Sequence, residues 1–73
     1  MRKKSSAIGI KIEEARKKAG LSRRKFMLCL KRYGVDVTEA TIFNWESGVT
    51  VPTADRILII AKALKSKPDF FWS

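Results

Sequence analysis

Residues 38–48 read TEATIFNWESG and predict a short amphipathic helix. Thr38 has a side chain suited to cap the start of a helix, and Glu39 follows in the first turn, where the helix dipole favours a negative charge. Ile42 and Trp45 lie three residues apart and therefore share one face. The final glycine is typical of a helix end. The segment therefore predicts a helix that two apolar side chains hold against a core.

The sequence on either side predicts four more helices. Toward the N-terminus, Ile8, Ile12, Ala15 and Ala19 recur at helical spacing and define an apolar stripe. No segment alternates apolar and polar residues as a half-buried strand would. The predicted helices run from near Ser6 to Gly20, from Ser22 to Gly34, from Thr38 to Gly48, from Thr53 to Leu64 and, opened by Pro68, from Asp69 to Trp72. This pattern predicts an all-α domain of five short helices.

The chain is short and strongly basic. Its 73 residues fit one domain with a modest core, and we expect a basic tail at residues 1–5 and a folded domain at residues 6–73. It contains 16 Lys and Arg against 7 Asp and Glu, which gives a formal charge of +9. The usual reason for such an excess is an anionic partner, either nucleic acid or an acidic membrane surface. A basic surface that serves only solubility is the alternative.

The residue inventory argues against an enzyme. The sequence has no His, no glycine-rich phosphate loop, no metal-ligand cluster and no paired carboxylates in a plausible cleft. Its single cysteine, Cys29, lies in an apolar run and is expected to be a small buried side chain. No apolar stretch is long enough to span a membrane. We therefore expect no catalytic residue, metal, cofactor, small-molecule substrate or membrane partner, and a cytoplasmic location.

Most of the chain, from about Ile8 to Phe71, resembles the helix-turn-helix domain of the phage-repressor (Cro and Xre) family. The residues that carry the resemblance are Arg16, Gly20-Leu21-Ser22, Phe26, Leu30, the stretch from Thr41 to Gly48, Pro52-Thr53 and the stretch from Ile57 to Leu64. The resemblance implies a compact, five-helix, lambda-repressor-like fold in a bacterial or phage-encoded protein that binds double-stranded DNA.

The resemblance also assigns roles to residues. The helix Thr38–Glu46 would enter the major groove, where base edges are distinguishable. An ion pair between Arg16 and Glu46 would join the first and third helices. The positions expected to face bases are Thr38, Glu39, Ala40, Thr41, Phe43 and Asn44. The positions expected to contact phosphates are Ser22, Arg23, Ser47 and Thr50.

The chain departs from the family pattern in three places. Met27 stands where a small residue is usual, and Arg23 replaces a common glutamine. The segment between Leu30 and Thr38 is also longer than in the commonest form, which predicts a second helix extended by a turn.

Several roles have a plain alternative. Asn44 could pair bidentately with adenine, or be an exposed polar residue. Glu39 could accept a bond from cytosine, stabilise the helix dipole, or pair with Arg23. Phe43 could contact a thymine methyl, or pack against Tyr33 or the turn that follows it. The basic residues from Arg2 to Lys4 could form an arm that reaches a groove, or a solvated tail.

The leading functional hypothesis is a sequence-specific transcriptional regulator of the repressor type. Its partners would be double-stranded DNA and a second copy of the chain, at least on DNA. Ile59, Phe70 and Trp72 would contribute to the dimer interface, because adjacent aromatics on one short helix cannot all point inward. The alternative is an antitoxin-type or adaptor module that keeps the fold but binds a protein. Its support is a recognition helix without Lys or Arg.

Overall fold

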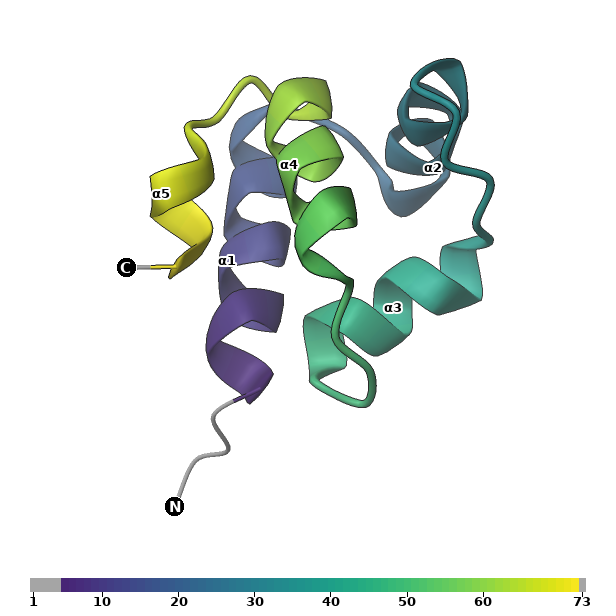
Figure 1. Ribbon diagram of the computed structural model, residues 1–73. Helices are drawn as coiled ribbons and strands as arrows, with labels where there is room; N and C mark the ends of the chain where they lie inside the picture. Colours follow the sequence, from purple (N-terminus) through teal and green to yellow (C-terminus); the bar gives the residue numbers. More distant parts are fainter. Residues whose placement is uncertain (1–4, 73) are drawn as a thin grey trace.

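The computed structural model describes residues 5–72 and contains five helices in this part of the chain (Figure 1). They are α1 (Ser5–Lys18), α2 (Arg23–Arg32), α3 (Glu39–Ser47), α4 (Ala54–Ala63) and α5 (Pro68–Trp72). Residues 5–72 include no strand, so the predicted all-α, five-helix fold is confirmed. Helix α1 begins at Ser5, the last residue of the predicted tail, whereas Arg2, Lys3 and Lys4 lie outside the described residues.

Three helices begin with the capping residues that the sequence predicts. The hydroxyls of Ser22, Thr38 and Thr53 each accept a hydrogen bond from the backbone N–H three residues further along, at 3.1, 3.1 and 3.3 Å. A cap of this kind satisfies a backbone donor that the helix itself cannot, and it is typically worth about 1 kcal/mol. The starts of α2, α3 and α4 are therefore determined locally.

The helix ends differ in how they are made. Helix α3 stops at Gly48, which adopts the left-handed conformation with φ of 83°. Lys65 adopts the same conformation after α4 with φ of 56°, although its β-carbon disfavours it. Helix α2 stops at Arg32, and residues 33–38 then connect it to α3. Part of the extra length before Thr38 is therefore in the connection, where Val35 is buried in the core.

One core joins all five helices. Helix α1 packs against α3 and α5, and α2 packs against α3 and α4. Ile8 is partly buried, but Ala19 is exposed, so the predicted stripe on α1 ends at Ala15. Cys29 is half-buried rather than fully enclosed. The buried apolar residues are Ile12, Ala15, Phe26, Leu30, Val35, Ile42, Trp45, Ile57, Ile60, Ala61, Leu64 and Phe71.

Helix α1 passes so close to the end of α3 that only glycine fits at the contact. A β-carbon at Gly9 would lie against the carbonyl oxygen of Trp45 and 2.7 Å from that of Glu46. These are backbone atoms, which cannot rotate away as the end of a flexible side chain could. Gly9 therefore sets the distance between α1 and the last turn of α3.

We expect Gly9→Ala to destabilise the protein. On an exposed helix surface the same change would stabilise by about 1 kcal/mol, but overpacking a close contact typically costs about 1–3 kcal/mol. Urea unfolding measures the net loss, and near-ultraviolet circular dichroism reports the packing of the buried Trp45 ring.

Gly20→Ala is the matched control, because a β-carbon there meets nothing within 4 Å. It should lose stability only through its positive φ of 76° and leave the Trp45 signal unchanged. A Gly9→Ala protein as stable as the wild type would contradict the close contact.

Candidate nucleic-acid interface

Helix α3 has one face in the core and one face toward solvent, on the right-hand side of the molecule in Figure 1. Ile42, Trp45 and Glu46 are buried. Among the positions predicted to face bases, Thr38, Glu39, Ala40 and Phe43 are exposed, and Thr41 and Asn44 are half-buried. All six lie on or next to the same short helix, so the structure brings the predicted base-reading residues together.

The two threonines of this set are engaged with each other. The Thr38 hydroxyl accepts from the Thr41 backbone N–H and lies 3.1 Å from the Thr41 hydroxyl. Their first role is therefore to fix the start of α3. Of the other predicted base-reading residues, Glu39, Ala40 and Phe43 are exposed and Asn44 is half-buried beside them.

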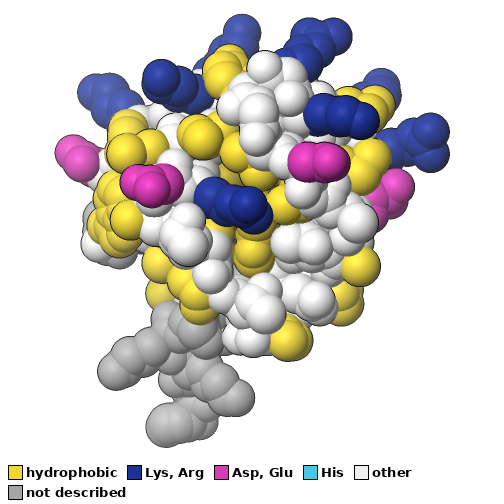
Figure 2. All heavy atoms as spheres, turned by 45° about the vertical axis from the view of Figure 1, so that its right-hand side comes forward, with side chains coloured by type: hydrophobic (Ala, Val, Ile, Leu, Met, Phe, Trp, Pro, Cys, Tyr) yellow, Lys and Arg dark blue, Asp and Glu magenta, His cyan; other side chains and the backbone are white. Residues whose placement is uncertain are grey.

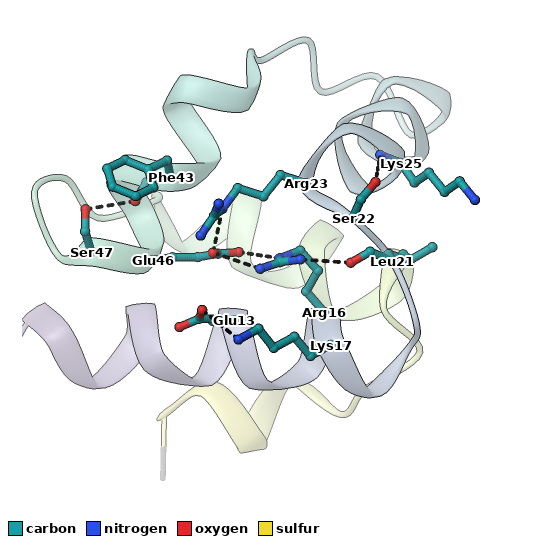
Figure 3. A network of polar contacts seen from close by, with 10 residues as sticks. All are labelled: Glu13, Arg16, Lys17, Leu21, Ser22, Arg23, Lys25, Phe43, Glu46 and Ser47. Carbon is teal, nitrogen blue, oxygen red and sulfur yellow. Dashed lines mark hydrogen bonds and ion pairs between the residues drawn. The ribbon is translucent and has the colours of Figure 1, made fainter.

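A buried ion pair joins α1 to α3, as Figure 3 shows. Arg16 Nε donates to Glu46 Oε2 at 2.7 Å, and Arg16 Nη2 donates to Glu46 Oε1 at 3.2 Å. Arg16 Nη1 also donates to the Leu21 carbonyl at 2.9 Å, which ties the same side chain to the turn before α2. Arg16 and Glu46 are 6% and 7% exposed, so water screens this pair poorly.

A second arginine contacts the same carboxylate. Arg23, the first residue of α2, donates from Nε to Glu46 Oε1 at 2.9 Å. Its guanidinium carbon also lies 5.1 Å from the centre of the Phe43 ring, within the range of a cation–π contact (Figure 3). The proposed pairing of Arg23 with Glu39 is therefore wrong, and the ring contact of Phe43 is with Arg23 rather than Tyr33.

The remaining residues predicted to contact phosphate lie at exposed positions beside α3. Ser22 caps α2. Ser47 donates from Oγ to the Phe43 carbonyl at 2.8 Å, so its hydroxyl must rotate away from this carbonyl before it can donate to a phosphate oxygen. Thr50 donates its backbone N–H to the Asn44 carbonyl at 3.2 Å and keeps its side chain exposed. These contacts hold the loop after α3 close to the end of that helix.

Positive charge lies mainly to one side of α3 and is absent from the helix itself. The nine residues of α3 include no Lys or Arg. Lys and Arg side chains project along the upper edge of this side of the molecule, while its lower half shows mainly uncharged groups (Figure 2). The arrangement fits a polar helix flanked by groups that can attract a polyanion.

The predicted dimer residues lie at the other end of the fold, on α4 and α5. Trp72 is 50% exposed, Phe71 is fully enclosed, and Ile59 and Phe70 are half-buried. Phe70 packs edge-on against Phe71 with ring centres 5.2 Å apart. One aromatic of the three thus faces the core, and Trp72 extends furthest into solvent.

Sequence reasoning missed two contributions to this site. Gly9 was not predicted to matter. A glycine inside an amphipathic helical pattern nevertheless often has a packing reason, such as the close approach of another helix. The contact of Arg23 with Glu46 was also missed, since the family resemblance implied only the pairing of Glu46 with Arg16. Within residues 5–72, no group of His, Cys, Asp or Glu could hold a metal ion. No helix there is long and apolar enough to cross a membrane.

We expect Glu46→Ala to lower the free energy of unfolding by about 3–5 kcal/mol, because Arg16 would remain buried without its counter-charge. Thermal and urea unfolding measure the loss. Glu13→Ala is the control, since it removes only the exposed Glu13–Lys17 pair at 3.2 Å and should cost less than about 0.5 kcal/mol. Equal losses from the two variants would show that the buried pair does not stabilise the fold.

The comparison with known protein families agrees with this geometry. A family model described as helix-turn-helix matches residues 31–71, which is more than half of the chain and includes all of α3 and α4. The first helix and most of α2 lie outside the matched residues, and there the resemblance depends on Arg16, Ser22 and the core positions. No curated protein and no solved structure matches the chain. The chain belongs to the helix-turn-helix family of the Cro/C1 (Xre-like) type, a family of DNA-binding domains of transcription regulators.

Proposed function

We propose that this protein is a sequence-specific transcriptional repressor that reads the major groove with the segment Thr38–Glu46. The observation that carries the proposal is the exposed face of α3, whose start is capped by Thr38 and whose last turn is anchored by the buried Glu46. A helix fixed at both ends can present side chains to base edges without first becoming ordered, which lowers the entropic cost of binding. Repression by occupancy of an operator needs no catalytic group.

Three side chains of α3 contact base edges in this proposal. Asn44 offers the amide that pairs bidentately with adenine. Glu39 accepts a bond from a cytosine amino group, and Ala40 leaves room for a thymine methyl. Thr38 and Thr41 flank these contacts. Ser22, Ser47 and Thr50 contact phosphates on either side and fix the register without reading sequence.

A protein-binding role is the second candidate, because α3 lacks Lys and Arg and because apolar side chains are exposed near its end. Val49 is 69% exposed and Val51 is 48% exposed in the loop that follows α3. An antitoxin-type or adaptor protein could use such a surface. DNA binding that is weak, unselective and abolished by moderate salt would favour this candidate.

Selection of bound duplexes from a randomised DNA pool tests the proposal. We expect a short motif to be enriched at moderate salt. Asn44→Ala should relax the preference at one base position by roughly 5- to 150-fold and leave the others intact, because one bidentate contact is lost.

Asp69→Asn on α5 is the control and should select the same motif as the wild type. A wild-type protein that enriches no motif would overturn the sequence-specific role. Equal weakening by Asn44→Ala on every sequence would show that Asn44 does not read a base.

We further propose that two copies bind an inverted repeat through α4 and α5, with Ile59, Phe70 and Trp72 at the contact. Trp72→Ala should weaken binding to a duplex with two half-sites while leaving binding to one half-site unchanged, because only the contact between copies is removed. Leu28→Ala on α2, with a similar exposed fraction of 48%, is the control. Sedimentation that shows only monomer, with and without DNA, would contradict the dimer.

A further inference from the structure

The recognition helix lacks the side chains that most often read guanine. Specific contacts to guanine usually come from Arg or Lys, which donate to O6 and N7 in the major groove. Helix α3 contains neither. Its own side chains therefore suit adenine through Asn44 and cytosine through Glu39, and guanine is left without a reader on this helix.

Arg23 places a guanidinium on α3 from the neighbouring helix. It is the first residue of α2, yet its side chain lies against Phe43 and Glu46, both on α3 (Figure 3). Phe43 is exposed and directly precedes Asn44. The arginine is therefore located beside the outward face of the recognition helix.

Two contacts fix the plane of this guanidinium. The Phe43 ring lies 5.1 Å from its central carbon, and Glu46 Oε1 accepts from its Nε at 2.9 Å. The Glu46 side chain is only 2% exposed and is itself held by Arg16, so it is a rigid partner. The arginine is thus positioned before any ligand arrives, which is the condition for selective binding.

The Arg23 side chain is partly accessible to solvent and has two terminal nitrogens that no described residue binds. The Arg23 side chain is 35% exposed. Among residues 5–72, its hydrogen bonds involve only Nε, so the two terminal nitrogens retain their N–H donors. Two parallel N–H groups match either two phosphate oxygens or the O6 and N7 atoms of guanine.

The fixed plane of the guanidinium, rather than its charge, favours the base over the phosphate. Arg16 and Arg23 share the single negative charge of Glu46, so Arg23 keeps a positive charge, and the bond to Glu46 adds the fixed donor geometry that a guanine edge requires. Arg24 and Lys25 follow on the same helix, are exposed, and form no ion pair with any described residue. They are better suited to phosphate, which needs charge more than a fixed plane.

We infer that Arg23 reads a guanine in the major groove, with Phe43 and Glu46 as the residues that position it. This inference depends on the proposed function, since it requires sequence-specific binding to DNA. It changes the role of Arg23 from a phosphate contact to a residue that determines which DNA sequence is preferred. It also supplies the recognition surface with the donor pair that α3 lacks.

The test compares the wild type with Arg23→Lys in selection from a randomised duplex pool. Lysine keeps the charge but has no planar pair of donors. We expect a guanine in the wild-type motif that the variant no longer selects. Preference for that guanine, measured by fluorescence anisotropy with single-base variants of the duplex, should fall from roughly 5- to 150-fold to near onefold. The dependence of affinity on salt should stay the same.

Arg24→Lys is the matched control and should select the wild-type motif. Phe43→Leu should reduce the preference for the same guanine, and Phe43→Tyr should retain it, because only an aromatic ring stacks on the guanidinium. Circular dichroism melts confirm that each variant is folded, and Arg16 still neutralises Glu46 in all of them.

Two outcomes would overturn the inference. If Arg23→Lys selects the wild-type motif, and Arg23→Ala weakens all sequences while lowering the salt slope by about one, Arg23 binds phosphate. That result would leave the proposed function standing. If the wild type enriches no motif at all, the proposed function fails and the inference fails with it.

Discussion

The ion pairs of the Glu46 carboxylate are the interactions on which the other features of the site depend. This carboxylate receives Arg16 from α1 and Arg23 from α2, and it belongs to the last turn of α3. One negative charge therefore links the three helices α1, α2 and α3. Burial excludes water from the Arg16 pair, so the pair must be satisfied by protein groups, and the additional bond to the Leu21 carbonyl completes it. The orientation of α3 follows from this geometry.

The close approach at Gly9, which like Arg16 lies on α1, acts on the backbone of the same turn of α3. Glu46 determines the direction in which the helix is held, and Gly9 determines its distance from α1. Ile42 and Trp45 fill the space between them. Several independent contacts thus fix the position of the buried side of α3, while its outer side makes few contacts. A surface of this kind can be selective because its backbone does not adjust to each new sequence.

The fold was largely predictable because its signals are local. Capping residues such as Thr38 and glycine stops such as Gly48 act within one turn, and the apolar spacing of Ile42 and Trp45 is visible in a single segment. The Arg16–Glu46 pairing followed from the family resemblance. The position of Arg23 could not be predicted, because it depends on how α2 crosses α3 and on a carboxylate that lies 23 positions later in the chain. Spacing along the sequence gives no information about that crossing.

The way Arg23 joins Glu46 has a consequence for divergence among related helix-turn-helix domains. Arg16 already neutralises the carboxylate, so the exchange of Arg23 for another residue leaves no unpaired buried charge. Phe43 is exposed and contributes little to the core. Descendants of this protein can therefore change both positions without loss of fold, and under the inference above such changes alter the base that is preferred. On Glu46, Arg16 maintains the domain, whereas Arg23, the residue that we infer to read DNA, can be replaced without cost to that pairing.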